Sequence, residues 1–248
     1  MEISQFLDAT YLKTPKQANI SKEENLQRVI HLVQEAILYN YKLIMIRAEY
    51  VKTVKQFLEQ AQVRVSIGTV VDFPKGNSTL EKKLQEAQEA INLGANELDF
   101  VINYTAFKAG NLELIKKEVT NCVKLCLINT KVAKFIIEVA ALSNQEIIVI
   151  SQLIKNVVIN NFGEENAKNV FVKSATGFYI TENNKPNGAT LEIMKLISEN
   201  AKPLKVKAAG GVKDYETALK MIALGVDRIG TSAALAIVNK KQNTKQGY

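Results

Sequence analysis

The chain has 248 residues, of which 47% are apolar and 23% are charged, with two cysteines and one histidine. These proportions exclude a disordered chain, a collagen and a small domain held together by disulfides, and the length suits one domain of barrel size. The formal net charge of +7 rests mainly on lysine, since the sequence has only four arginines, and no nucleic-acid-binding motif is present, so we expect no nucleic-acid partner.

Eight β-prone segments alternate with longer segments of helical periodicity. The predicted strands span residues 6–10, 42–47, 64–71, 97–103, 133–139, 169–176, 205–210 and 228–232. This alternation predicts an α/β protein: a single (β/α)8 TIM barrel over residues 1–248, with a short N-terminal segment and a flexible C-terminal tail at about 239–248. A doubly wound open sheet is the alternative, although no G-x-G-x-x-G motif follows the first strand.

Several predicted helices carry signals for where they begin and end. Capping boxes, in which a serine and a glutamate each bond the other's backbone N–H, are expected at Ser21 with Glu24, Ser78 with Glu81 and Ser143 with Glu146. Asp214 is expected to cap a helix N-terminus, and Gly94 and Gly225 are expected to end helices.

Metal and triad chemistry have few residues to use in this sequence. The cysteines, Cys122 and Cys126, lie on the apolar stripe of a predicted helix, which is typical of buried thiols. The single histidine, His31, falls on the polar side of another predicted helix, so we expect no metal site and no Ser-His-Asp triad. The start of the chain lacks a signal-peptide pattern and no apolar run is long enough to span a membrane, so we expect a cytoplasmic protein with no membrane partner.

Four ionisable residues interrupt predicted strands that should be apolar on both faces. They are Asp8, Asp99, Lys173 and Lys207. Each falls within or near the C-terminal half of its strand, the end of a barrel that carries the active site. Ion pairs at the barrel rim are the alternative interpretation, which four such residues together disfavour.

Lys173 and Lys207 fall on consecutive strands, which are neighbours about 4.8 Å apart in a barrel. If both point inward, their ammonium groups would lie within about 6 Å, and their repulsion would lower a pKa by about two units. A neutral amine at pH 7 can attack a carbonyl and form a Schiff base. Asp99 would then act as a proton shuttle, directly or through water.

Small residues follow the last two predicted strands. They are Gly210 and Gly211 after the seventh strand and Gly230, Thr231 and Ser232 at the end of the eighth. In barrel enzymes the loops at these two positions often bind a phosphate through backbone N–H groups. The two signals together predict a phosphate site.

At these residues the sequence resembles the deoxyribose-phosphate aldolase family of class I aldolases, from Phe6 to about Val238. The most specific segments are GTVVDFPKGNST, GANELDFVINYTAFKAGN, KFIIEVAAL, FVKSATGF and VKAAGGVKDYETALKMIALGVDRIGTSAALAIV. The resemblance implies reversible cleavage of 2-deoxy-D-ribose 5-phosphate into D-glyceraldehyde 3-phosphate and acetaldehyde, in deoxyribose phosphate catabolism. It implies a small phosphosugar substrate and no metal or organic cofactor, and it allows a homodimer.

The resemblance also implies roles for individual residues. Lys173 matches the imine-forming lysine, Lys207 the second lysine that perturbs its pKa and relays protons, and Asp99 the proton-transferring carboxylate. The implied substrate contacts are Asp8 at the sugar hydroxyls, Thr176 near the sugar, and Gly177, Gly210, Gly211, Gly230 and Ser232 at the phosphate.

The sequence departs from the family pattern at several positions. These are Ala9, Met45, the segment Arg47–Ala48–Glu49, Ala175 and Ala233. None replaces the two lysines or Asp99, so we expect them to affect affinity and rate rather than the reaction class. Arg47 is either an additional anion contact or a rim residue. A different aldolase or phosphosugar enzyme and a non-catalytic phosphosugar binder are the alternative functions.

Overall fold

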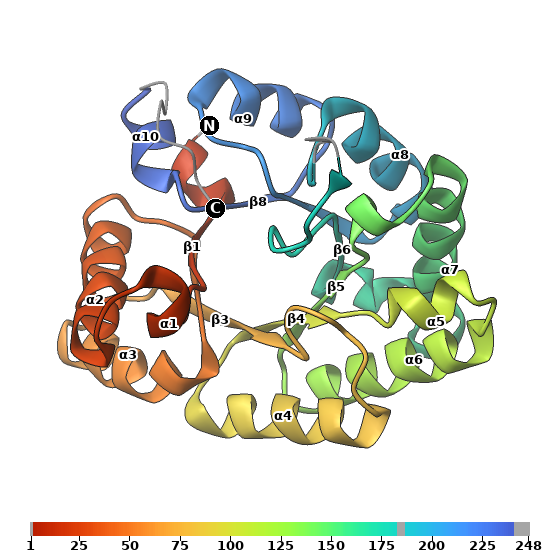
Figure 1. Ribbon diagram of the computed structural model, residues 1–248, viewed down its shortest axis with the longest axis horizontal. Helices are drawn as coiled ribbons and strands as arrows, with labels where there is room; N and C mark the ends of the chain where they lie inside the picture. The colour runs from red at the N-terminus through yellow and green to blue at the C-terminus, as the bar shows by residue number, and fades with distance from the viewer. Residues whose placement is uncertain (1, 183–186, 241–248) are drawn as a thin grey trace.

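Eight parallel strands close into a barrel in chain order in the computed structural model, which describes residues 2–182 and 187–240 (Figure 1). The strands are β1 (Leu7–Tyr11), β2 (Leu43–Ile46), β3 (Ser66–Val71), β4 (Glu97–Val101), β5 (Val132–Ile136), β6 (Val170–Lys173), β7 (Lys205–Ala209) and β8 (Arg228–Thr231). β8 pairs with β1 and completes the ring. The predicted (β/α)8 fold is confirmed, and the open sheet is excluded.

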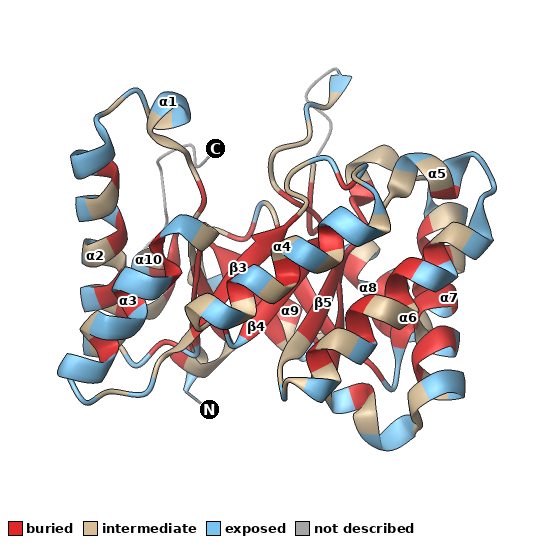
Figure 2. Ribbon diagram, turned by 90° about the horizontal axis from the view of Figure 1, so that it is seen from below, coloured by how far each residue is buried: buried red, intermediate tan, exposed pale blue. Residues whose placement is uncertain are grey.

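Helices surround the barrel, and all but the first carry buried residues, which face the strands (Figure 2). They are α1 (Pro15–Ala18), α2 (Lys22–Leu38), α3 (Ala48–Gln60), α4 (Leu80–Leu93), α5 (Tyr104–Lys108), α6 (Leu112–Ile128), α7 (Asn144–Phe162), α8 (Leu191–Ala201), α9 (Tyr215–Ala223) and α10 (Ala234–Val238). Short 3-10 helices span Ile3–Phe6, Val139–Ala141 and Glu164–Asn169, the first forming the N-terminal segment. Within the described ranges, no helix is long and apolar enough to cross a membrane. Residues 241–248 of the predicted tail lie outside the described residues.

The helix signals are confirmed with one exception. Capping boxes form at Ser21 and Ser143, Asp214 caps α9, and Gly94 ends α4 in a left-handed conformation. Gly225 has a φ of +89° directly after Leu224, the C-cap of α9.

The box predicted at Ser78 is wrong. Thr79 caps α4 instead and accepts from the Lys82 N–H, whereas Ser78 donates its N–H and hydroxyl to the Asp72 carboxylate. Two adjacent residues of the capping type compete here, and the tertiary contact to Asp72 decides between them.

The cysteine and histidine expectations also agree with the structure. Cys122 and Cys126 are free thiols buried on the inner face of α6, and burial raises the pKa of both. His31 lies on the exposed side of α2, 3.1 Å from the Glu35 carboxylate.

Strand register decides which side chains share the barrel interior, because paired residues of parallel strands point to the same face. Val70 pairs with Asp99 and Asp99 with Lys134. Across the barrel Lys173 pairs with Lys207, which in turn pairs with Arg228. The interior of the barrel is therefore charged over much of its surface, while the main apolar core lies between the strands and the helices.

Candidate active site

Seven ionisable side chains meet inside the barrel. They are Asp8, Glu97, Asp99, Lys134, Lys173, Lys207 and Arg228, and each is at least nine-tenths buried. Four cations therefore face three carboxylates in this cluster, so its charges balance when one amine is neutral.

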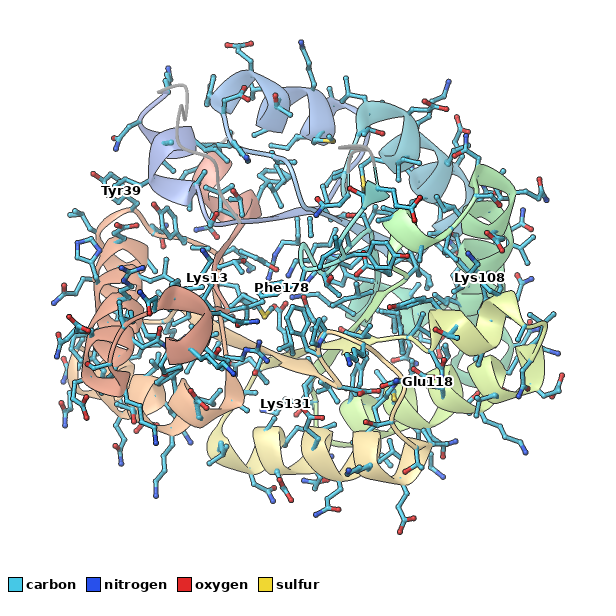
Figure 3. All side chains as sticks on the ribbon, viewed as in Figure 1. Lys13, Tyr39, Lys108, Glu118, Lys131 and Phe178 are labelled. Carbon is cyan, nitrogen blue, oxygen red and sulfur yellow. The ribbon has the colours of Figure 1, made fainter. Side chains whose placement is uncertain are left out.

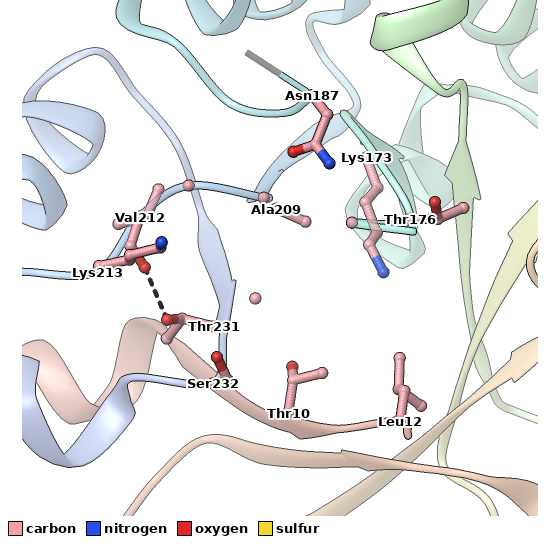
Figure 4. A pocket seen from close by; sticks show the side chains of 14 residues that line it. Thr10, Leu12, Lys173, Thr176, Asn187, Ala209, Val212, Lys213, Thr231 and Ser232 are labelled. Atoms are coloured by element: carbon pink, nitrogen blue, oxygen red, sulfur yellow. Dashed lines mark hydrogen bonds between the residues drawn. The ribbon is translucent and has the colours of Figure 1, made fainter. Parts of the chain in front are cut away.

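Asp99 connects the two predicted lysines. Its Oδ2 accepts from Lys173 Nζ and from Lys207 Nζ, each at 2.8 Å. The two nitrogens are therefore at most twice that distance apart, which confirms that both amines point inward and lie side by side. Lys173 reaches into a pocket at the C-terminal end of the barrel (Figure 4), whereas Lys207 is fully buried beneath it.

The amine of Lys207 has a lowered pKa. Burial, together with the ammonium groups of Lys134 and Lys173, lowers the pKa of Lys207 to about 8, against the opposing effect of the Asp8 and Asp99 carboxylates. The sequence favours a neutral amine on Lys173, the lysine of the sixth strand, and that stays a prediction. The structure adds a lowered pKa for Lys207, whose amine is enclosed among the other charges, and strand spacing does not reveal this enclosure.

A deeper layer of the cluster was missed from the sequence. Lys134 Nζ lies 3.1 Å from Asp8 Oδ2 and 3.3 Å from Asp99 Oδ1, and it also pairs with Glu97. Arg228 donates to Asp8 Oδ1 at 2.7 Å and to both Glu97 oxygens at 2.9 and 3.0 Å. Glu97, Lys134 and Arg228 fall at the first or second position of their predicted strands, so a rule that selects charges near the C-terminal half of a strand passes over them.

This layer keeps the buried carboxylates ionised. Burial alone would raise the pKa of Asp99, but Lys134, Lys173 and Lys207 together hold it well below its ordinary value. The pKa of Asp8 is likewise held low by Lys134, Lys207 and Arg228 against the effect of burial. Next to these cations, Asp8 and Asp99 are protonated only transiently. Both carboxylates are therefore suited to passing protons between amines.

Asp8 occupies a different place from the one expected. It is the second residue of β1, in the N-terminal half of the strand, and its oxygens contact Lys134, Lys207 and Arg228. It does not line the pocket, whereas Thr10, two residues further along the same face, does. The predicted contact between Asp8 and sugar hydroxyls is therefore not supported by its position.

The other predicted contacts gather around one pocket of about 160 Å³ above Lys173 (Figure 4). The predicted residues that line it are Thr176, Gly177, Gly210, Gly211, Gly230 and Ser232. Lining residues that the sequence analysis did not single out as contacts include Thr10, Asn187 and Lys213. Lys213 adds a cation to the side of the pocket where the phosphate was predicted.

Backbone N–H groups in this pocket are available to an anion. Those of Gly177, Gly211 and Ser232 donate to no acceptor among the described residues. Gly210 and Gly211 have φ values of +84° and +91°, which a residue with a side chain adopts only under strain. A phosphate would satisfy these donors, as expected for loops of this kind.

Gly230 has a second consequence for the cluster below the pocket. A Cβ atom at this position would lie 3.0 Å from Lys207 Cε and 3.7 Å from its Nζ. The glycine therefore leaves room for the Lys207 side chain to cross toward Asp99.

Glu138 is another residue that the sequence analysis missed. Ile137 and Val139 donate to the consecutive carbonyls of Lys173 and Ser174, so Glu138 is an extra residue in a β-bulge with a φ of +56°. Its Oε2 accepts from the hydroxyl and the N–H of Thr176. The Thr176 hydroxyl is thereby directed at Glu138 and fixes the turn that begins the β6–α8 loop.

The departures from the family pattern lie in distinct places. Ala9 packs in the outer core, Ala175 is buried, and Ala233 precedes α10 with its N–H donating to Thr231 Oγ1. Arg47 donates to the Leu12 carbonyl at 2.8 Å and lies 5.0 Å over the ring of Phe73, which favours the rim interpretation.

Comparisons with known proteins agree with this arrangement. The family model of the DeoC/LacD family aldolases matches residues 5–240. A deoxyribose-phosphate aldolase from Clostridium kluyveri is 36% identical over 242 residues, covering 97% of this chain and 98% of the relative. The crystal structure of a putative deoxyribose-phosphate aldolase from Coccidioides immitis has a TM-score of 0.79 at 28% identity, covering 96% of this chain and 86% of that one. A tetrameric deoxyribose phosphate aldolase from Aeropyrum pernix has a TM-score of 0.75 at 26% identity, with 96% and 89% covered.

Proposed function

The chain belongs to the DeoC/LacD family of aldolases, which are carbon–carbon lyases, and from this membership we propose that it cleaves 2-deoxy-D-ribose 5-phosphate reversibly. The products are D-glyceraldehyde 3-phosphate and acetaldehyde, and the reaction passes through an imine on Lys173. The reaction serves the breakdown of deoxyribose phosphate.

The observation that carries this proposal is the shared contact of two amines with one carboxylate oxygen. Lys173 Nζ and Lys207 Nζ both lie 2.8 Å from Asp99 Oδ2, and Lys173 lines the pocket. A proton can therefore pass from Lys173 through Asp99 to Lys207, whose pKa of about 8 lets it exist in both forms near neutral pH. This transfer leaves Lys173 neutral and nucleophilic.

Neutral Lys173 attacks C1 of the open-chain sugar aldehyde and forms a carbinolamine. Loss of water gives a protonated imine, which acts as an electron sink. Asp99, together with Lys207, takes the proton of the C3 hydroxyl while the C2–C3 bond breaks. The electron pair of that bond forms the C1–C2 double bond of an enamine, and the electron pair of the imine double bond moves to the nitrogen. D-Glyceraldehyde 3-phosphate leaves, the resulting enamine is protonated at C2, and water adds to the imine and releases acetaldehyde and the free amine.

The phosphate end of the substrate is assigned to the loops after β6, β7 and β8. Support comes from the N–H groups of Gly177, Gly211 and Ser232 and from the ammonium group of Lys213 beside them. Asp8 lies below the pocket, where its ion pairs hold the side chains of Lys207 and Arg228 in place.

An assay of acetaldehyde release tests the proposed reaction. The wild-type chain is expected to release acetaldehyde from 2-deoxyribose 5-phosphate and to leave fructose 1,6-bisphosphate and a transaldolase substrate pair unchanged. Turnover of either alternative in preference to deoxyribose 5-phosphate would contradict the substrate. Ligand-induced thermal stabilisation without any turnover would contradict the catalytic function.

A further inference from the structure

One side of the barrel interior beside the pocket carries a cluster of apolar side chains. Leu12, Leu43, Met45 and Val70 form a buried cluster that is separate from the main core, with Phe73 and Phe178 packed against it. We refer to these six residues as the apolar wall. A Cβ atom on Gly68 would lie 2.5 Å from Met45 Cε, so this glycine leaves room for the methionine inside the barrel.

The apolar wall is held in place by loops that meet across the barrel mouth. Phe73 follows β3, and Phe178 follows β6 on the opposite side of the ring, yet their rings meet edge to face with centroids 5.0 Å apart. In the view along the barrel, Phe178 lies near the middle of the ring of strands (Figure 3). Arg47 lies over the Phe73 ring and donates a hydrogen bond to the Leu12 carbonyl. The loops after β1, β2 and β3 therefore all take part in this contact.

Leu12 is the member of the wall that reaches the substrate pocket. It lines the pocket together with Lys173, and the two side chains point toward each other from opposite sides (Figure 4). The polar groups around Lys173 Nζ, namely Asp99 and Lys207, lie below it, and the glycine loops lie toward β7 and β8. Leu12 therefore faces the part of the pocket that neither the proton-transfer groups nor the phosphate loops occupy.

We propose that the apolar wall is the subsite of the C2 carbon, and that Leu12, supported by Met45 and Val70, selects substrates without a hydroxyl group at C2. This inference rests on the proposed function, because it takes Lys173 as the residue bonded to C1. In the imine, C2 is two bonds from Nζ, while C3 to C5 lead away to the phosphate loops. The remaining substituents of C2 then face Leu12.

A hydroxyl group placed against the side chains of this wall would lose its water without gaining a hydrogen-bond partner from them. The side chains of Leu12, Met45 and Val70 have no group that donates or accepts a strong hydrogen bond. A methyl group of nearly the same size would keep its apolar contacts there. An apolar pocket discriminates against a hydroxyl in place of a methyl by about a hundredfold, so selectivity of that order is expected.

The synthetic direction provides a matched pair of probes. With D-glyceraldehyde 3-phosphate as acceptor, propanal and glycolaldehyde are donors that carry a methyl and a hydroxyl group, respectively, at the same carbon. The wild-type chain is expected to use propanal with a kcat/KM about a hundredfold above that for glycolaldehyde. Equal use of the two donors, or a preference for glycolaldehyde, would overturn the proposal.

Variants of Leu12 locate the selectivity. Leu12→Asn keeps the size but adds hydrogen-bonding groups, and it is expected to lower the propanal-to-glycolaldehyde ratio at least about tenfold. Leu12→Met, the apolar control, is expected to keep the ratio within about threefold. An unchanged ratio in Leu12→Asn would show that Leu12 does not determine selectivity. If circular dichroism shows that Leu12→Asn does not fold, Met45→Gln takes its place and is expected to lower the propanal-to-glycolaldehyde ratio by the same factor.

Failure of this inference differs from failure of the proposed function. If the wild-type chain joins acetaldehyde to D-glyceraldehyde 3-phosphate but does not discriminate between the two probes, only the role of the apolar wall is wrong. If it uses none of the three donors, both the aldol reaction at Lys173 and the inference built on it are wrong.

Discussion

Inside the barrel, the charged side formed by β4 to β8 and β1 contrasts with the apolar side formed by β2 and β3. Each side contains an inward-facing glycine that leaves room for a long side chain of the neighbouring strand. Gly230 makes room for Lys207, and Gly68 makes room for Met45. A glycine beside a long side chain thus occurs on both sides. The charged side sets the protonation of the reacting amine, whereas the apolar side presents a surface without hydrogen-bonding groups. Five variants test this division.

The largest effect is expected on the charged side from Lys173→Ala. The nucleophile is lost, so kcat/KM for 2-deoxyribose 5-phosphate should fall at least about a thousandfold. The assay is acetaldehyde release, with circular dichroism to confirm folding. A folded variant that keeps a tenth of the wild-type activity would rule out the imine at this position.

Lys207→Met should lower kcat about a hundredfold and change the pH profile. Because the neutral form of Lys207 accepts the proton, kcat/KM of the wild type should rise with pH until about 8 and then level off. The variant should lack this rise. A wild-type profile that is flat between pH 6 and 9 would contradict the assignment.

The same amine has a defined effect on stability. Its pKa is lowered in the folded state, so between about pH 8 and the ordinary lysine value near 10.5 the unfolded chain binds a proton that the native chain does not. The contribution of Lys207 to the free energy of unfolding therefore rises with pH across that window. Lys207→Met removes this contribution, which denaturant titrations of both proteins at pH 7.5 and 10 can measure.

The two glycines provide a paired comparison of intermediate size. Gly230→Ala should displace Lys207 by a few tenths of an ångström, lower kcat about tenfold and shift the rise near pH 8. Gly68→Ala should instead force the end of Met45 to move and lower the free energy of unfolding by about 1 to 3 kcal/mol, without shifting the pH profile. Identical effects of the two substitutions on the pH profile would refute the division between the sides.

The smallest effect is expected outside both sides. Ser143→Ala removes the N-cap of α7 and should lower the free energy of unfolding by about 1 kcal/mol. Aldolase activity should stay at the wild-type level, since Ser143 contacts neither the pocket nor the charged cluster. A loss of activity comparable to that of Gly230→Ala would mean that the assays report general stability rather than the site.

The sequence predicted well what depends on local pattern. All eight strands lie close to the predicted segments, because parallel strands covered on both faces are continuous apolar runs. Lys173, Lys207 and Asp99 stood out as charges within such runs, and the structure brings their charged groups together.

What the sequence did not reveal depends on contacts between distant segments. The pKa of Lys207 is lowered because that amine is buried beside the ammonium groups of Lys134 and Lys173, which come from two other strands. The apolar wall needs Phe73 and Phe178, from opposite sides of the barrel, to meet. Neither burial nor such a meeting follows from spacing along the chain.

Trapping the imine tests the central chemistry most directly. Treatment of the wild-type chain with acetaldehyde and borohydride, followed by peptide mass spectrometry, is expected to place one ethyl group on Lys173. The Lys173→Ala variant should remain unmodified under the same conditions. An adduct on Lys207 instead, or one that persists on the barrel interior of Lys173→Ala, would contradict the account.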